Sequence, residues 1–156
     1  MKKANTIQAK RPIIGYTTGV YDMFHIGHLN IIRNAKKQCD FLIVGVSTDE
    51  LVQKTKHKTP VIPYEERFDI VSSLKYVDMI VPQEDKDKFA AWKKYGFSKM
   101  FVGSDWEGTP AWKEYEKQFA PTGVEIVYLP HTDGISSTKL TAVIKQILDE
   151  NPDIVD

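Results

Sequence analysis

Two histidines three residues apart are the side chains in this sequence best placed to do chemistry. His25 and His28 lie in the stretch 19–28, and Gly27 stands between them. An apolar run at residues 12–16 precedes this stretch and residues with helical spacing follow it, which predicts a turn from a strand into a helix. The first N–H groups of a helix are free, and the helix dipole favours an anion there. The pattern therefore predicts a phosphate-binding strand end at which two imidazoles can donate hydrogen bonds.

Two other interpretations of the histidine pair stay open on the residues alone. Histidines near a helix start can be structural, as caps or as surface residues. A His-x-x-His pair can also bind zinc, but zinc needs further ligands of the Cys, His or carboxylate type. No such residue stands at a convincing spacing. The sequence therefore predicts no metal site built by the protein alone.

Length and composition narrow the possible classes of protein. The 156 residues favour one domain, which we place at residues 12–150 between tails at 1–11 and 151–156. The 21 basic and 21 acidic residues give no net charge, so no overall field favours nucleic acid or a membrane surface. A single cysteine, Cys39, fits a reducing compartment. Because no signal-peptide or membrane-span pattern is present, we expect a cytoplasmic protein that binds neither nucleic acid nor membrane.

Strand and helix patterns alternate along the chain. Apolar runs predict strands at residues 12–16, 41–46, 76–81, 99–103 and 124–128. Helical spacing and capping signals predict helices that begin near residues 25, 47, 63, 85, 109 and 137. This alternation with short connections predicts an α/β fold, a Rossmann-like doubly wound parallel sheet of five strands. Ligands of such sheets bind beyond the carboxyl ends of the strands.

Basic side chains follow several of these predicted strands. Lys54 and Lys56 come after the second strand, in a stretch without apolar periodicity that predicts a loop. Arg67 lies in the third predicted helix, and Lys88 lies near the start of the fourth. Each of them can be an ordinary solvated or ion-paired residue. A place near the strand ends also suits them to contact phosphate.

Hydroxyl side chains begin the last predicted helix. Ser136, Ser137 and Thr138 follow the fifth predicted strand, and apolar residues at helical spacing continue to Leu148. The hydroxyls can simply cap this helix. They can equally donate to the phosphates of a nucleotide, together with the free N–H groups of the first turn.

These motifs resemble those of one enzyme family. Residues 25–28, His-Ile-Gly-His, resemble the signature of the nucleotidyltransferase superfamily, and residues 19–22, Gly-Val-Tyr-Asp, resemble the small cytidylyltransferases, above all those acting on glycerol 3-phosphate. Residues 105–108, Asp-Trp-Glu-Gly, and residues 131–138 are similar to further stretches of that family. His131 departs from the pattern, because arginine is usual there. We expect the affinity for CTP, or its pH dependence, to differ accordingly.

The resemblance implies a reaction and its participants. CMP would pass from CTP to a small phosphate monoester by in-line attack with release of pyrophosphate, and glycerol 3-phosphate is the best candidate acceptor. A polyol, sugar or amino-alcohol phosphate would present the same dianion, so the sequence does not select among them. The resemblance also implies Mg²⁺ with the CTP, a homodimer, the strand order 3-2-1-4-5, and a CDP-glycerol product for cell-envelope synthesis.

The resemblance also implies the residues of each part of the site. For catalysis it implies His25, His28, Lys54 and Lys56, and for the acceptor Lys54, Arg67 and Lys88. For the nucleotide it implies Gly19, Val20, Tyr21, Asp22, Gly27, Asp105, Trp106, His131, Thr132, Gly134, Ile135, Ser136, Ser137 and Thr138.

Two rival functions are compatible with the same residues. The first is an adenylyltransferase of the same fold that acts on a sugar phosphate, since residues 63–67 and 135–138 resemble those enzymes too. The second is a non-catalytic nucleotide-binding module, which would bind CTP without releasing pyrophosphate. The nucleotide that stabilises the protein separates the adenylyltransferase from the cytidylyltransferase. The release of pyrophosphate separates the non-catalytic module from both enzymes.

Overall fold

A parallel five-stranded sheet forms the centre of the molecule. The computed structural model describes residues 10–154. The strand order is β3-β2-β1-β4-β5 and every neighbouring pair is parallel, so the predicted α/β fold and strand order are confirmed. The strands are β1 (Ile14–Gly19), β2 (Phe41–Ser47), β3 (Met79–Gln83), β4 (Lys99–Gly103) and β5 (Glu125–Leu129).

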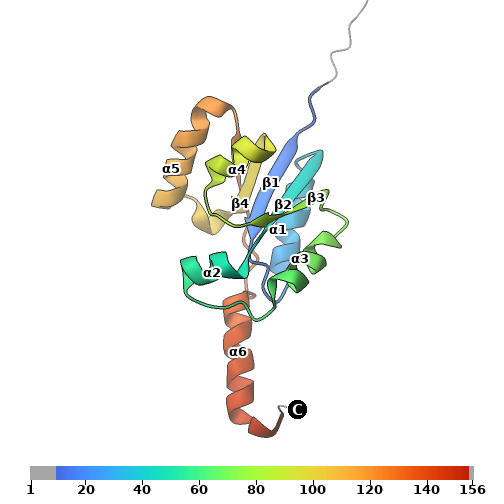
Figure 1. Cartoon of the computed structure of the whole chain (residues 1–156), viewed down its shortest axis with the longest axis vertical. Helices are drawn as coiled ribbons and strands as arrows, with labels where there is room; N and C mark the ends of the chain where they lie inside the picture. The colour runs from blue at the N-terminus through green and yellow to red at the C-terminus, as the bar shows by residue number, and fades with distance from the viewer. Residues whose placement is uncertain (1–9, 155–156) are drawn as a thin grey trace, which may run out of the picture.

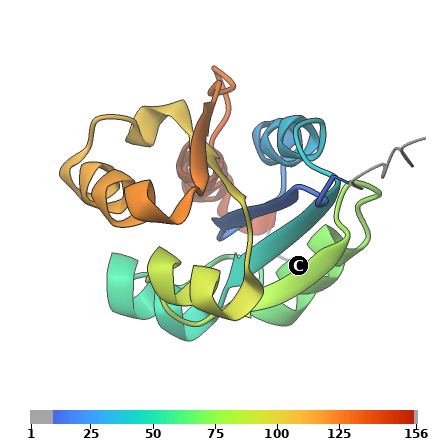
Figure 2. The same ribbon diagram turned by 90° about the horizontal axis from the view of Figure 1, so that it is seen from above.

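Helices cover both faces of this sheet, as Figures 1 and 2 show. The α-helices are α1 (Ile26–Lys36), α2 (Asp49–Lys56), α3 (Tyr64–Ser72), α4 (Lys88–Tyr95), α5 (Pro110–Phe119) and α6 (Ser137–Glu150). Short 3₁₀ turns are η1 (Ser104–Trp106), η2 (Ala120–Thr122) and η3 (Pro152–Ile154). Helices α1 and α3 pack on one face of the sheet, and α4 and α5 pack on the other. Helix α6 extends away from the body of the molecule.

Strand β2 explains why the sheet needs helices on both sides. Its side chains alternate: Leu42 and Val44 belong to the core cluster under α1 and α3, whereas Ile43 belongs to the cluster under α4 and α5. Successive side chains of a strand point to opposite faces, so a strand that is apolar at every position is stable only when both faces are covered.

The predicted element boundaries were wrong in several places. Strand β1 begins and ends later than predicted, and α4 begins at Lys88 rather than near residue 85. The segment predicted as a lysine-rich loop is helical as far as Lys56, because Thr48 caps α2 and Leu51 and Val52 are buried. Two helical turns are too short to show a clear apolar period. Strand β3 begins and ends later than predicted, and Pro82 lies within it. An edge strand tolerates proline because one of its sides needs no N–H donor.

The structure describes only part of the two predicted tails. Strand β1 begins at Ile14, and residues 1–9 of the predicted N-terminal tail lie outside the described residues. After α6 the described chain ends in the turn η3. Within residues 10–154, no helix has both the length and the apolar character that crossing a membrane requires.

One buried cation joins the carboxyl ends of the first two strands. The side chain of Arg67 on α3 is buried, and the residue is only 1% exposed. Its Nη1 donates to the carbonyl oxygens of Val20 (2.6 Å) and Ser47 (2.8 Å), and its Nε donates to that of Ile62 (2.9 Å). Its Nη2 pairs with Asp49 at 2.7 Å. Arg67 thus fixes β1, β2, α2 and α3 relative to one another.

Replacing Arg67 by methionine tests this role. Methionine has a similar reach but removes the donor of one buried and two partly buried carbonyl groups. It also leaves Asp49 without its partner, so we expect Arg67→Met to lower the free energy of unfolding by about 3–5 kcal/mol. Urea unfolding followed by circular dichroism measures the change. Arg11→Met, at an exposed position before β1, is the matched control. A loss below about 1 kcal/mol would show that the Arg67 contacts are dispensable.

Candidate active site

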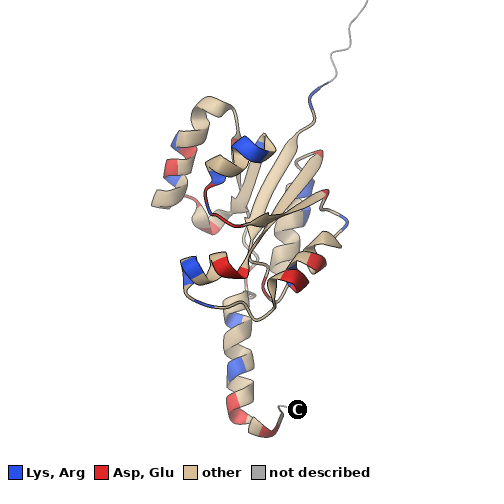
Figure 3. Ribbon diagram, in the orientation of Figure 1, with Lys and Arg blue, Asp and Glu red and all other residues tan. Residues whose placement is uncertain are grey.

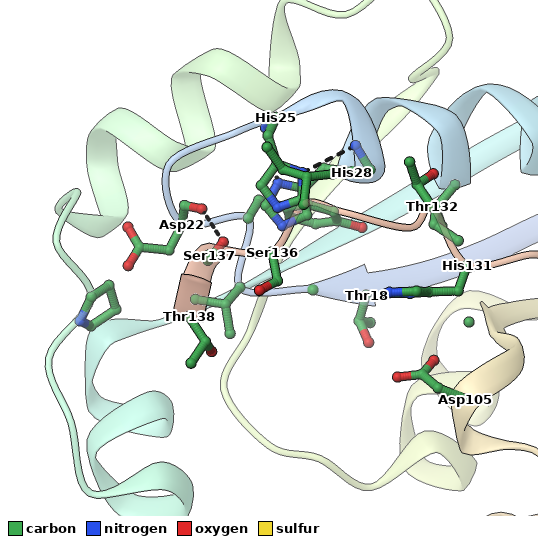
Figure 4. A pocket seen from close by; sticks show the side chains of 18 of the residues that line it. Thr18, Asp22, His25, His28, Asp105, His131, Thr132, Ser136, Ser137 and Thr138 are labelled. Atoms are coloured by element: carbon green, nitrogen blue, oxygen red, sulfur yellow. Dashed lines mark hydrogen bonds between the residues drawn. The ribbon is translucent and has the colours of Figure 1, made fainter. Parts of the chain in front are cut away.

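A cavity of about 400 Å³ opens at the carboxyl ends of β1 and β4. Figure 4 shows its side chains converging from three segments: the turn after β1, the loop after β4, and the segment that leads into α6. The start of α1 carries His25 and His28, and the start of α6 carries Ser136 and Ser137. Two helix N-termini therefore face one cavity, which is an arrangement suited to a polyanion.

The two histidines cap their own helix. The Nδ1 atom of His25 accepts a hydrogen bond from the N–H of Gly27 at 3.0 Å, and the Nδ1 atom of His28 accepts one from the N–H of His25 at 3.2 Å. The two rings stack with centroids 3.8 Å apart. Because each Nδ1 is an acceptor, each Nε2 carries the proton and is a donor. The two histidines can therefore cap the helix through Nδ1 and still donate a hydrogen bond through Nε2.

Burial keeps both imidazoles neutral. Burial lowers the pKa of His25, and it lowers the pKa of His28 to about 4, with the neighbouring His25 as a second cause. Asp22 acts in the opposite direction but is the weaker influence. Near neutral pH the pair thus offers two neutral donors to a ligand, and positive charge must come from other residues.

A strained turn brings these groups together. Tyr21 and Met23 have positive φ angles of 55° and 47°, which residues other than glycine seldom adopt. Between them, both carboxylate oxygens of Asp22 accept hydrogen bonds from the N–H groups of Val61 and Ile62, at 2.9 Å each. Asp22 therefore anchors the loop after α2, although it also lines the cavity.

The second signature is tied to the first by two side-chain contacts. Ser137 donates to the carbonyl oxygen of Asp22, and Asn30 on α1 donates to the hydroxyl of Thr132 at 3.0 Å. Ser136 is the N-cap of α6, and its hydroxyl accepts from the N–H of Lys139. Thr138 lines the cavity beside them. The two motifs, more than a hundred residues apart in the sequence, form one continuous wall.

A second cavity of about 320 Å³ adjoins the first. The two share the end of β1 at Thr18–Val20, and they also share Lys56 and Trp106. Three lysines line the second cavity: Lys56 at the end of α2, Lys86 in the segment before α4, and Lys88 at the start of α4. Figure 3 shows the lysines of these two helices. This is the most basic part of the site.

Lys88 is held in place within this cavity. Its Nζ donates to the hydroxyl of Thr18 at the end of β1. Burial, and then the nearby Lys86, lower the pKa of Lys88 to about 8. Burial and the neighbouring lysines also lower the pKa of Lys56. Lysines that are desolvated and repel one another are stabilised by an anionic ligand.

The structure gathers most of the residues that the sequence singled out. All of the predicted nucleotide residues line the first cavity except Gly134, which lies beside it in the same loop with a φ of 82°. His25, His28 and Lys56 line that cavity as well. Lys88 lines the second cavity, where the acceptor residues were expected.

Two predicted site residues lie elsewhere. Lys54 is exposed on α2 and lines neither cavity, because helical geometry turns it away from the face that carries Lys56. Arg67 also lines neither cavity, because its guanidinium is buried against backbone carbonyls and Asp49. The prediction that Arg67 contacts the acceptor is corrected: in this structure it holds the framework of the site.

Sequence reasoning missed the polar residues at three strand ends. Thr18, Ser47 and Gln83 stand at the ends of β1, β2 and β3, and each lines the second cavity. The rule that ligands bind beyond the carboxyl ends of parallel strands was the signal that could have found them.

The described residues do not form a complete ligand set for a metal ion. Within residues 10–154, no group of three His, Cys, Asp or Glu side chains converges on one point. Asp105 is the cavity carboxylate whose oxygens have no hydrogen bond among the described residues, since Asp22 is used by the loop. One carboxylate together with nucleotide phosphates and water is the usual environment of Mg²⁺. The site therefore fits a magnesium ion that enters with a nucleotide.

Comparison with known proteins gives the same assignment. The family described as cytidylyltransferase-like matches residues 16–143. A glycerol-3-phosphate cytidylyltransferase of Staphylococcus aureus is 38% identical over 125 residues, which is 80% of this chain and 89% of that protein. One of Bacillus subtilis is 34% identical over 125 residues, 80% of this chain and 91% of that protein.

A solved structure supports the fold independently. A lipopolysaccharide core biosynthesis protein of Thermoplasma volcanium superposes with a TM-score of 0.65. It is 24% identical, and the match covers 78% of this chain and 98% of that one. At this identity the likeness concerns the fold alone.

The lowered pKa of His28 predicts a pH-dependent stability. Between about 6.5 and 4, an unfolded histidine binds a proton that the folded His28 does not, so the free energy of unfolding falls as the pH falls through this range. His28→Gln keeps an acceptor for the N–H of His25 but cannot be protonated. We expect the variant to lose about 2–3 kcal/mol less than the wild type between pH 7 and pH 4.5.

Urea unfolding at the two pH values measures this difference. His57→Asn is the control, because His57 caps the exposed end of α2 in a left-handed conformation that asparagine tolerates. Equal losses in the wild type and in His28→Gln would contradict a neutral, buried His28.

Proposed function

This chain belongs to the cytidylyltransferase-like family, and on that basis we propose that it transfers CMP from CTP to glycerol 3-phosphate. The observation that carries the proposal is the pair of joined cavities that share the end of β1 and Lys56. CTP occupies the first cavity, and the acceptor phosphate occupies the second. The reacting phosphates meet at the shared wall.

The acceptor brings its own nucleophile. The second pKa of a phosphate monoester is about 6, so near pH 7 the acceptor is mostly a dianion and needs no general base. One of its oxygens forms a bond to the α-phosphorus of CTP while the bond from that phosphorus to the bridging β-oxygen breaks. Pyrophosphate leaves and CDP-glycerol remains. The protein must align two polyanions and stabilise the charge that develops between them.

Different residues supply the donors and the charge. The Nε2–H groups of His25 and His28, with the N-terminal N–H groups of α6, donate to the CTP phosphates. Lys56 contributes positive charge where the cavities join, and Lys86 and Lys88 contribute it on the acceptor side. Mg²⁺ bound with CTP would offset further phosphate charge, and Asp105 is the side chain best placed to help hold it.

We propose that the working form is a homodimer built on α6. The residues Val143, Ile144, Ile147 and Leu148 form one apolar face of this helix and are 38–45% exposed. The helix extends from the body of the molecule, and no other part of residues 10–154 covers this face. A second copy would bury two such faces against each other, as symmetric dimers do. The role of the product in cell-envelope synthesis rests on the family resemblance.

The function is tested by measuring pyrophosphate release. CTP and ATP, each with Mg²⁺, are paired with glycerol 3-phosphate, a sugar phosphate, O-phosphoethanolamine and phosphocholine. We expect release with CTP and glycerol 3-phosphate, and we expect His28→Ala to slow it about 100-fold or more because one oxyanion donor is lost. Release only with ATP would support the adenylyltransferase, and binding of CTP without release would support the non-catalytic module.

The dimer is tested by a charge on the apolar face of α6. We expect the wild type to sediment as a dimer at 50 µM and Ile144→Glu to sediment as a monomer, because a buried carboxylate without a partner is strongly unfavourable. Ala142→Glu adds the same charge on the opposite face of α6 and should stay dimeric. A monomeric wild type, or a dimer that survives in Ile144→Glu, would contradict the proposal.

A further inference from the structure

The second cavity has a polar floor that the proposed transfer of CMP leaves unused. Ser47 and Gln83, at the ends of β2 and β3, line this cavity and are each only 6% exposed. They lie opposite each other in the parallel register of the two strands. A buried amide between apolar neighbours is costly unless its hydrogen-bonding groups find partners.

The hydrogen bond between them leaves the amide nitrogen of Gln83 available. The hydroxyl of Ser47 donates to Oε1 of Gln83 at 2.8 Å, which fixes the orientation of the amide. The backbone carbonyl of Gln83 accepts from the N–H of Thr48 at 3.1 Å. Among the described residues, the two N–H donors of Nε2 have no hydrogen-bond acceptor. They are the unused donors of a side chain that is fixed in the cavity wall.

The positions of the lysines define which end of an acceptor meets Gln83. Lys88 is bound to Thr18 at the end of β1, and Lys56 lies where the two cavities join. A phosphate is attracted to this side, close to the nucleotide. Gln83 belongs to β3, and its side chain approaches that of Thr18 across Gly45 of the intervening strand β2. A phosphate bound by Lys88 and Lys56 therefore brings the adjoining carbon chain of a small acceptor within reach of Gln83.

The charge of the cavity disfavours one class of acceptor. Three lysines line it, and no Asp or Glu is among the described residues that do so. An ammonium group at the far end of the acceptor would meet positive charge without a carboxylate to pair with. A hydroxyl group would meet the Nε2 donors of Gln83 instead.

We propose that Gln83, oriented by Ser47, binds a hydroxyl group of the acceptor and so selects hydroxylated, uncharged phosphate monoesters over alkyl and amino-alcohol phosphates. This inference rests on the proposed function and adds the residue that sets its acceptor specificity. Gln83 contacts the acceptor away from the reacting atoms, while Ser47 is a positioning residue. Sites built to pair a substrate hydroxyl reject the analogue that lacks it, because a buried polar group is then left unpaired.

Competition between two matched acceptors tests the proposal. Glycerol 3-phosphate and n-propyl phosphate have the same carbon chain and the same dianion, and they differ in the two hydroxyl groups. With CTP and both acceptors in one reaction, we expect the wild type to favour glycerol 3-phosphate at least tenfold. Gln83→Leu should reduce this preference about tenfold while turnover of n-propyl phosphate stays within threefold. O-Phosphoethanolamine should be used at least tenfold less well than glycerol 3-phosphate.

Controls separate specificity from damage to the fold. A purely structural role of Gln83 would slow both acceptors equally and leave the preference unchanged, which would overturn the inference. Ser47→Ala should reduce the preference in the same direction but less than Gln83→Leu. Gln118→Leu, exposed on α5 and lining neither cavity, should behave as the wild type.

A binding measurement distinguishes failure of this inference from failure of the proposed function. Calorimetric titration of the whole chain with each acceptor does not require turnover. If no pair of nucleotide and acceptor releases pyrophosphate, the proposed function fails. If Gln83 nevertheless binds the acceptor hydroxyl, the wild type still binds glycerol 3-phosphate at least fivefold more tightly than n-propyl phosphate. Equal binding of the two by the wild type overturns the role of Gln83 whatever the outcome of the activity assay.

Discussion

The buried guanidinium of Arg67 is the interaction on which both cavities depend. Its N–H groups donate to carbonyl oxygens just beyond β1, at the end of β2 and in the loop before α3, and it forms an ion pair with Asp49, the first residue of α2. Arginine can do this because its five N–H donors form a rigid fork that stays charged. Without Arg67 these carbonyl groups would lose their hydrogen-bond donor. Asp22 continues the same framework by holding the loop at Val61 and Ile62.

Within this framework, different side chains supply the neutral hydrogen-bond donors and the positive charge. His25 and His28 are used as caps on one nitrogen and as donors on the other, and burial keeps them neutral. Positive charge comes from lysines in both cavities: Lys56 and Lys58 line the one that holds the histidines, and Lys56, Lys86 and Lys88 line the second. Burial and repulsion between neighbouring lysines lower the pKa of Lys56 and of Lys88. A ligand with phosphates on both sides of the β1 end would therefore meet neutral imidazole donors on one side and lysines on both sides.

Much of the fold followed from local patterns. The run 99–103 and the helix after Thr109 were predicted to within a residue, because an apolar run and a proline in the first helical turn are local features of the sequence. The histidine pair and the hydroxyls before α6 were correctly grouped into one cavity, since parallel strands bring their carboxyl ends to one edge. Lys54 and Arg67 were misplaced. A helix of two turns does not show from sequence which side chains face the cavity, and the burial of Arg67 depends on carbonyl groups far away in the chain.

The sequence by itself determined the alternation of strands and helices, the polar starts of α1 and α6, and the family of the chain. These depend on residue type and spacing over a few positions. Only the tertiary structure decided that Arg67 faces inward, that Lys56 rather than Lys54 reaches the cavities, and that Ser47 and Gln83 meet. Each of these depends on which strands are neighbours and in what register. Such a relation joins residues far apart in the chain, and no local pattern encodes it.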